Sequence, residues 1–200
     1  MKDKASHLVK SYLKTDKHFN QLYPIAVQVM SERHWTPLHI AMQAASFLGE
    51  RAGSKILDIG SGVGKFCLAA AVHHPQANFF GIEQRAQLVN YALIAKQILN
   101  VKNASFTHGN FTQLDLHNYD HFYFFNSFYE NLDDDVRIDN AISYSEGLYE
   151  YYSLHLYNKL RRMPSGTRIA TYHTFWHEIP REYKIVESLE NGELNFWIRR

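Results

Sequence analysis

The sequence of 200 residues has one cysteine, Cys67, and no excess of charge of either sign. A lone cysteine excludes a disulfide framework or a thiolate metal cluster within the chain, which is typical of proteins from a reducing compartment. Because 21 basic and 20 acidic residues leave a formal net charge of +1, the broad positive field of a nucleic-acid or membrane binder is missing. No apolar run reaches about 18 residues, and no apolar signal core follows Met1. We therefore expect a cytoplasmic protein with no membrane partner and no strong nucleic-acid signal.

The composition is that of a globular domain. Hydrophobic residues make up 46% of the chain and charged residues 20%, which favours a folded core over disorder. A chain of this length suits one domain, since domains typically run to about 100–200 residues. We expect a single domain over residues 1–200, with an N-terminal helical segment over 1–50 and the main core over 54–200.

The most informative stretch is a short apolar strand, Ile56 to Ile59, that runs into three glycines at alternate positions. An apolar segment from Phe66 to Val72 follows it. This order predicts the strand, tight turn and helix of a nucleotide-binding α/β domain. Glycine lets a ligand approach the backbone, and the start of the following helix points free N–H groups at that ligand.

The spacing of the glycines separates the possible ligands. A dinucleotide fingerprint requires a third glycine where Lys65 stands, and a Walker A loop requires Ser or Thr where Phe66 stands. What remains, Asp-x-Gly-x-Gly-x-Gly, resembles the first motif of the class I S-adenosylmethionine (SAM)-dependent methyltransferases. This resemblance implies that Asp58 faces the ammonium group of the cofactor, directly or through water. It also implies that the loop residues Gly60, Ser61, Gly62 and Gly64 wrap the amino-acid part of SAM.

An acidic residue stands about twenty residues beyond the glycine loop. Ala77 to Glu83 reads as the second strand, and Glu83 falls at its carboxyl end. A carboxylate there can accept hydrogen bonds from both ribose hydroxyls of an adenosine. Glu83 and the adjacent Gln84 are therefore predicted to bind the cofactor, although Glu83 does not separate NAD from SAM.

The ends of the third and fourth strands supply further candidates. Ala104 to His108 is the third predicted strand, and the resemblance implies that Asn110 and Phe111, which follow it, flank the adenine. Asp120 to Phe125 reads as a central parallel strand because its apolar run is nearly unbroken. It leads into Asn126, in the region where class I methyltransferases place the residues that meet the transferred methyl group.

Several motifs together resemble a narrower family, the non-SET histone-lysine methyltransferases of the disruptor-of-telomeric-silencing type. That family carries Asp-Leu-Gly-Ser-Gly-Val-Gly, Gly-x-Glu, Gly-Asp-Phe and Asn-Asn-Phe. The matching segments here are Asp58–Gly64, Gly81–Glu83, Gly109–Phe111 and Asn126–Phe128. The resemblance covers about residues 36–175, and Thr36 has a counterpart in a threonine-bearing loop of that family. Because this chain has no basic tail for chromatin, the acceptor stays open between a protein lysine and a small-molecule nitrogen or oxygen.

The rest of the chain fits the same architecture. Helical spacing predicts a helix from Leu38 to Leu48, and Thr36 either caps it or lines the site. A tyrosine-rich helix over 138–162 is either core or a wall of an acceptor pocket. Gly166 to Phe175 is the fifth predicted strand, and Asn191-Gly192 predicts a final antiparallel hairpin. The order of these elements, together with the resemblance to class I methyltransferases, predicts a Rossmann-like α/β fold. We expect a seven-stranded, mostly parallel sheet with helices on both faces.

The candidate catalytic residues follow the fourth and fifth strands. Asn126, Tyr129 and His173 are predicted to act on the acceptor, with Glu130 and His177 as further groups able to take a proton. No metal site is expected, because no carboxylate cluster at ligand spacing accompanies the histidines. Two alternatives stay open: a SAM-binding protein without transferase activity, and an NAD-dependent oxidoreductase. The oligomeric state cannot be read from the sequence.

Overall fold

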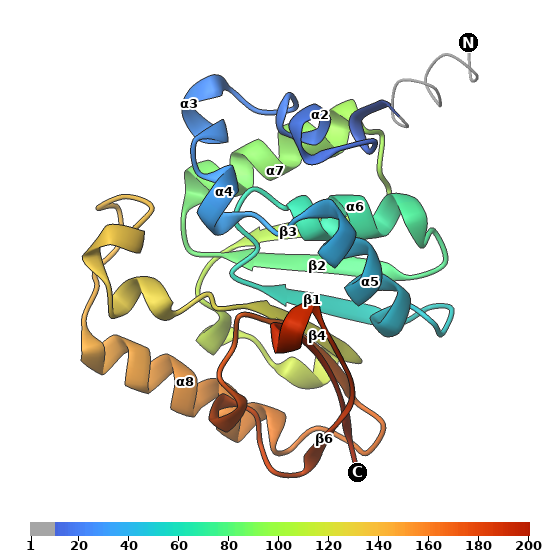
Figure 1. Cartoon of the computed structure of the whole chain (residues 1–200), viewed down its shortest axis with the longest axis vertical. Coiled ribbons are helices and arrows are strands. Elements are labelled where there is room, and N and C mark those ends of the chain that lie inside the picture. The colour runs from blue at the N-terminus through green and yellow to red at the C-terminus, as the bar shows by residue number, and fades with distance from the viewer. Residues whose placement is uncertain (1–10) are drawn as a thin grey trace.

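The computed structural model describes residues 11–200, so the first ten residues of the predicted N-terminal helical segment lie outside it. Its centre is one seven-stranded sheet of order β3-β2-β1-β4-β5-β7-β6 (Figure 1). The strands are β1 (Lys55–Ile59), β2 (Asn78–Glu83), β3 (Ala104–His108), β4 (His121–Phe125), β5 (Arg168–Tyr172), β6 (Tyr183–Leu189) and β7 (Leu194–Arg199). The first five strands pair in parallel and the last two form the antiparallel hairpin, which confirms the predicted fold class.

Helices cover both faces of this sheet. They are α2 (Asp16–Asn20), α3 (Ile25–Gln28), α4 (Ser31–His34), α5 (Leu38–Leu48), α6 (Lys65–His73), α7 (Ala86–Ile98) and α8 (Glu146–Leu160). Side chains alternate along each strand, so Ile56 packs with α5, α6 and α7 while its neighbour Leu57 packs on the face of α8. The two apolar clusters hold the strand ends in one rigid frame.

Helix α8 begins at Glu146, and the prediction of a helix from residue 138 is wrong. Between β4 and α8 the backbone is held by short polar side chains instead. The carboxylates of Asp133 and Asp139 accept hydrogen bonds from the N–H groups of Asp135 and Ala141, both at 2.9 Å. The Ser145 hydroxyl then caps α8 by accepting the Leu148 N–H at 3.1 Å. Such local bonds compete with a helix, which explains why the apolar spacing alone misleads here.

The start of α5 also differs from the prediction. The first free N–H group, that of Leu38, donates to the Asp16 carboxylate at 3.0 Å. Thr36 does not cap the helix; its hydroxyl is buried and shares a 3.0 Å hydrogen bond with the Tyr123 hydroxyl of β4. The fifth strand is shorter than predicted, because the backbone leaves the sheet at His173, which has a φ of 51°. Within residues 11–200, no helix combines the length and apolar character needed to cross a membrane.

Candidate active site

A cavity of about 730 Å³ lies at the carboxyl ends of the parallel strands. In Figure 1 the arrowheads of β1 and β2 point toward the side that carries α4 and the yellow segment between β4 and α8. The glycine loop, the ends of β2, β4 and β5, and the N-terminal segment all contribute to the cavity wall. Ligands of open α/β sheets bind at this edge. The predicted site residues in the cavity wall are Gly60, Gly62, Glu83, Asn126, Tyr129 and His173.

The glycine loop adopts the backbone that its sequence predicts. Gly60, Gly62 and Gly64 have φ angles of 78°, 52° and 81°, a region that side-chain-bearing residues rarely occupy. A Cβ atom on Gly60 would lie 2.5 Å from the Cβ and Oγ of Ser127. At Gly62 a Cβ atom would meet no described atom within 4 Å, and Gly62 lines the cavity. The loop therefore packs closely against the chain after β4 and leaves its backbone open toward the cavity.

Glu83 joins the glycine loop to the end of β2. Its side chain is only 5% exposed and lines the cavity. One carboxylate oxygen accepts the Gly62 N–H at 3.0 Å and the other accepts the Arg85 N–H at 2.9 Å. Burial raises the pKa of Glu83, while these N–H groups and the Arg85 charge oppose that shift. The carboxylate keeps free lone pairs for a ligand hydroxyl.

Asp58 lies behind the glycine loop and not on the cavity wall. It is 4% exposed, and the Cys67 thiol donates to its Oδ2 at 3.6 Å. Burial raises the pKa of Asp58 to about 8, and the negative charge of Glu83 adds to this shift. Its carboxyl group is therefore largely protonated at neutral pH in the free protein.

Arg85 is a site residue that the sequence analysis missed. Its buried guanidinium makes a bidentate ion pair with the Glu130 carboxylate, with N–O distances of 3.1 and 2.7 Å. It also donates hydrogen bonds to the Asp139 carboxylate at 3.0 Å and to the Tyr144 hydroxyl at 2.6 Å. Glu130 holds the pKa of Arg85 above its usual range against the effect of burial. No local pattern could have revealed this network, since the partners lie 45 to 59 residues away. Arg85 joins the loops after β2 and β4.

Beyond Arg85 lies a much smaller pocket of about 30 Å³ that contains Gln84 and Phe111 in its wall. Asn110 donates to the Gln84 side-chain oxygen at 3.1 Å and to the Tyr152 hydroxyl at 3.0 Å. Phe111 is buried and stacks on Phe128 with ring centres 5.1 Å apart. The structure thus brings the three residues predicted to flank adenine together and adds Tyr152 from α8.

The described residues of α8 contribute nothing to the wall of the large cavity. Tyr152, Leu156 and Leu160 are buried in the second apolar cluster. The tyrosine-rich helix is therefore better interpreted as part of the apolar core than as a wall of the acceptor pocket.

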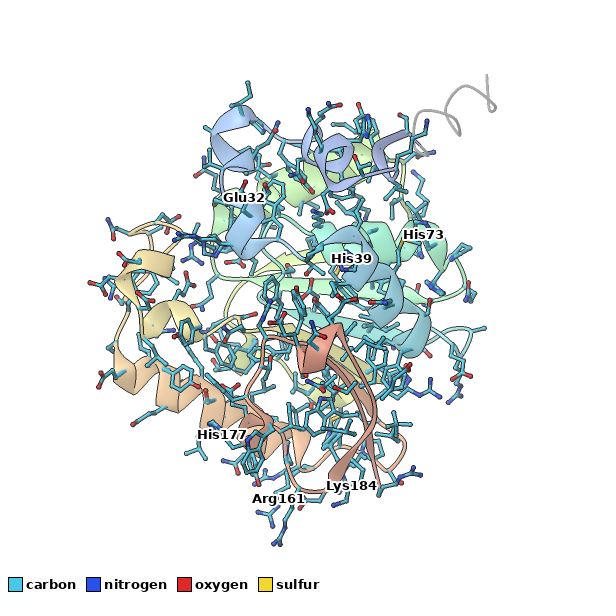
Figure 2. All side chains as sticks on the ribbon, in the orientation of Figure 1. Glu32, His39, His73, Arg161, His177 and Lys184 are labelled. Carbon is cyan, nitrogen blue, oxygen red and sulfur yellow. The ribbon has the colours of Figure 1, made fainter. Side chains whose placement is uncertain are left out.

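The N-terminal segment covers the cavity and is anchored at Lys65, the residue that replaces the third glycine. The Lys65 side chain is 3% exposed, and its Nζ donates to Asp16 at 2.5 Å and to Asn20 at 3.4 Å. The ammonium also lies 5.7 and 5.8 Å from the ring centres of Phe19 and Trp35. Trp35 lines the cavity, whereas Thr36 does not. Glu32, labelled in Figure 2, belongs to the same covering segment.

The candidate catalytic residues meet at the ends of β4 and β5. Asn126 and His173 both have left-handed backbone, with φ angles of 42° and 51°, and both line the cavity with Tyr129. Non-glycine residues in this conformation are uncommon and concentrate at functional sites. His173 Nε2 lies 3.4 Å from a Glu193 carboxylate oxygen. Figure 2 shows His177 beside α8, away from Glu32, so this second histidine lies outside the cavity.

One comparison with known proteins bears on the family of this chain. Residues 50–145 match the family model described as a methyltransferase domain. This match covers just under half of the chain, including β1 to β4, and supports a SAM-dependent methyltransferase domain there. SAM, the cofactor that the glycine loop predicts, is consistent with this match. A comparison with curated protein sequences returned no match. In the described residues no group of three or more His, Cys, Asp or Glu side chains is placed to hold a metal ion.

Solved structures show the same fold at low sequence identity. An RNA methyltransferase from Salinibacter ruber, crystallised with S-adenosyl-L-homocysteine (SAH), is 19% identical, with a TM-score of 0.52 over 82% of this chain and 92% of that chain. TrmN from Thermus thermophilus is 15% identical, with a TM-score of 0.59 over 86% of this chain and 51% of that one. A precorrin-6y C5,15-methyltransferase from Geobacter metallireducens GS-15 is 14% identical, with a TM-score of 0.53 over 84% and 90%. Likeness at this level shows the fold and leaves the acceptor open.

Proposed function

We propose that this methyltransferase moves the methyl group of SAM to an amine nitrogen of a small molecule or a protein side chain. The observation that carries the proposal is the meeting of the glycine loop, Glu83, Asn126 and His173 around one cavity of about 730 Å³. The wall of this cavity also includes the aromatic rings of Tyr129 and Tyr172. Aromatic faces attract cationic amines, which supports nitrogen over oxygen as the acceptor atom. The motif resemblance to the non-SET histone-lysine methyltransferases supports the same class of acceptor.

The residues of the cavity fit the cofactor. The backbone at Gly62 is open to the cavity. The adjacent Ser61 hydroxyl is buried against Gly81, outside the cavity wall, and has no hydrogen-bond partner among the described residues. We propose that residues Gly60 to Gly64 hold the amino-acid part of SAM and that Glu83 binds the ribose hydroxyls. Asp58 lies behind the loop, which favours contact with the ammonium group through water. We assign the adenine to Gln84, Asn110 and Phe111.

The small pocket beside Gln84 requires a rearrangement before it can take a purine ring. Its volume of about 30 Å³ is roughly that of one water molecule in the liquid. Both cavities are lined by Gly60, Glu83, Arg85, Ser127 and Glu130, so the Arg85–Glu130 pair forms part of the wall between them. We propose that this pair shifts when SAM binds and that the two cavities then form one groove.

Among the candidate bases, His173 and Tyr129 fit better than Glu130. Both carboxylate oxygens of Glu130 already accept hydrogen bonds from the Arg85 guanidinium, so this side chain is engaged away from an acceptor. When bound, SAM supplies an electrophilic methyl group. The chain's part is to hold the amine close to that group and to take one proton from it. His173, at the end of β5 and beside Glu193, is the proposed acceptor of this proton, and Asn126 is proposed to orient the amine.

Transfer of a labelled methyl group from SAM tests the proposal. We would offer polyamines and lysine-containing peptides in one set of reactions and hydroxyl compounds of similar size in another. We expect label in an amine, and a loss of about 100-fold or more in kcat with His173→Ala, the low end of general base catalysis. His177→Ala is the matched control, because His177 lies outside the cavity, and it should leave the rate unchanged. SAM binding without transfer to any amine would contradict the proposal and favour a binding protein without transferase activity.

A further inference from the structure

A second cavity, of about 650 Å³, lies at the opposite edge of the sheet. The turn after α5, the first residues of β4 and β5, and the turn after α8 form its wall. It shares no lining residue with the 730 Å³ cavity. Because it lies at the amino ends of parallel strands, the methyl-transfer site does not account for it. Its volume is within the range of small-molecule sites.

Positive charge dominates this second cavity. Arg51, Arg162 and Arg168 line it, against one carboxylate, Asp120. Arg168 is fixed by an ion pair with Glu50 and by a 2.7 Å hydrogen bond to the Phe47 carbonyl. Its guanidinium also lies over the Phe47 ring. Its charge is therefore compensated within the molecule.

Arg51 and Arg162 differ from Arg168 in this respect. Across residues 11–200, neither guanidinium makes a hydrogen bond or an ion pair. Both side chains are exposed, so no packing holds them in another role. Two arginines from different parts of the chain thus meet at one cavity with all their N–H donors available.

Asp120 and the adjacent His121 both accept hydrogen bonds from backbone N–H groups of neighbouring strands. Asp120 accepts the Lys55 N–H at 2.8 Å, which joins the start of β1 to β4. His121 Nδ1 accepts the Arg168 N–H at 3.1 Å, so Nε2 carries the proton of the neutral ring. Burial lowers the pKa of His121, and the charges of Arg168 and Arg51 act in the same direction against that of Asp120.

A buried hydroxyl without a partner lies in the same wall. Ser54 is 3% exposed, lines the cavity, and its Oγ has no hydrogen-bond partner among the described residues. A buried polar group is normally paired, and an unpaired one calls for an explanation such as a ligand. Ser54 stands directly before β1, three residues after Arg51. Its N–H donates to the Arg51 carbonyl at 3.2 Å, so the two residues belong to one turn in the cavity wall.

We propose that this cavity binds the phosphate group of a small phosphorylated molecule, with Arg51 and Arg162 as its main ligands. The planar guanidinium group matches phosphate oxygens through paired N–H donors. The Ser54 hydroxyl adds a neutral donor of the kind that phosphate sites use. A nucleoside monophosphate is the size of molecule that such a cavity can enclose.

The test is a calorimetric titration of the full chain with inorganic phosphate and with uridine monophosphate at constant ionic strength. Uridine is chosen because it lacks the adenine that the SAM site is proposed to bind. We expect saturable binding, and at least a tenfold loss of affinity in Arg51→Gln/Arg162→Gln, since hydrogen bonds to charged groups contribute this much or more. Equal affinity for the two probes would identify free phosphate as the ligand, and tighter binding of the nucleotide a phosphate monoester.

Arg161→Gln is the matched control, because Arg161 is adjacent in sequence but pairs with Glu182 at 3.1 Å and does not line the cavity. It should bind both probes like the wild type. Folding should be unaffected in the double variant, since neither side chain has a partner to lose, and SAM binding should stay unchanged. The proposal is overturned if neither probe binds or if the double variant binds them as the wild type does.

Discussion

At the scale of single residues, Asp58 is the group whose ionisation is linked most directly to the cofactor. It is buried behind the glycine loop with a pKa of about 8, against an ordinary value near 3.8. A nearby ammonium group stabilises the ionised carboxylate and so lowers this pKa. Binding of SAM is therefore expected to expel a proton from Asp58 at pH values below about 8.

We predict that at pH 7 the wild type releases most of one proton when it binds SAM. At this pH the α-amino group of SAM is still mainly protonated, so its own titration contributes little. Calorimetry in buffers of different ionisation enthalpy measures the number of protons released. Asp58→Asn, which cannot ionise, should bind SAM more weakly and release none. A wild-type binding heat that does not depend on the buffer would contradict the proposed link between Asp58 and the ammonium group.

Gly60 offers a second test at this scale, because its backbone and its packing both exclude a side chain. The left-handed conformation and the contact with Ser127 lead us to expect that Gly60→Ala lowers the free energy of unfolding by about 2–4 kcal/mol. Adding Ser127→Gly should recover the packing part of this loss. Gly53→Ala is the control, since Gly53 has a φ of 82° but a Cβ there meets no described atom within 4 Å. Urea unfolding distinguishes these variants, and equal losses in Gly53→Ala and Gly60→Ala would contradict the packing argument.

At the scale of elements, the covering segment from α2 to α4 depends on one ion pair, between the buried Lys65 and the half-exposed Asp16. Asp16 accepts hydrogen bonds from both the Lys65 ammonium and the Leu38 N–H, so one carboxylate holds α2, α5 and α6 together. Burial lowers the pKa of Lys65, and Asp16 counteracts this. An ammonium left without its partner among Phe19 and Trp35 would be strongly destabilising.

We expect Asp16→Ala to lower the free energy of unfolding by about 3 kcal/mol and to weaken SAM binding, because the cover loses its anchor. Lys65→Met is the informative comparison. It removes the buried charge, leaves Asp16 half exposed to water, and should cost less than about 1.5 kcal/mol. Denaturant unfolding gives both values, and hydrogen exchange of residues 11–37 reports the release of the cover. Greater destabilisation by Lys65→Met than by Asp16→Ala would show that this account of the pair is wrong.

The elements that sequence reasoning predicted well are those with local signals. The strands β1, β2 and β4 have short apolar runs bounded by turns, and the hairpin has Asn191-Gly192 between its strands. The start of α8 and the cap of α5 were missed because polar side chains decide them, and one of these, Asp16, lies 22 residues from the helix that it caps. Arg85 was missed for the same reason, since its partners become neighbours only in the folded chain.

At the scale of the whole molecule, the strand order explains how residues from distant parts of the sequence form one site. Parallel strands end at a common edge, so Glu83, Asn126 and His173 meet there although they are far apart in the chain. This convergence could be predicted once the motifs were assigned to strand ends. The division into segments 1–50 and 54–200 stays a prediction, as does the part that each site residue plays. The near-neutral net charge gave no sign of the second cavity, because its arginines are balanced by acids elsewhere.

The measurement that tests the central claim most directly is a calorimetric titration of the wild type and of Glu83→Gln with SAM and SAH. We predict one site per chain for both ligands in the wild type and an affinity about 10–100 times lower in Glu83→Gln, because a charged hydrogen-bond acceptor is lost. Asp134→Asn, whose side chain is 80% exposed and outside the cavity, should bind as the wild type does. A folded wild type that binds neither SAM nor SAH, or a Glu83→Gln variant with unchanged affinity, would contradict the assignment of the cofactor to this cavity.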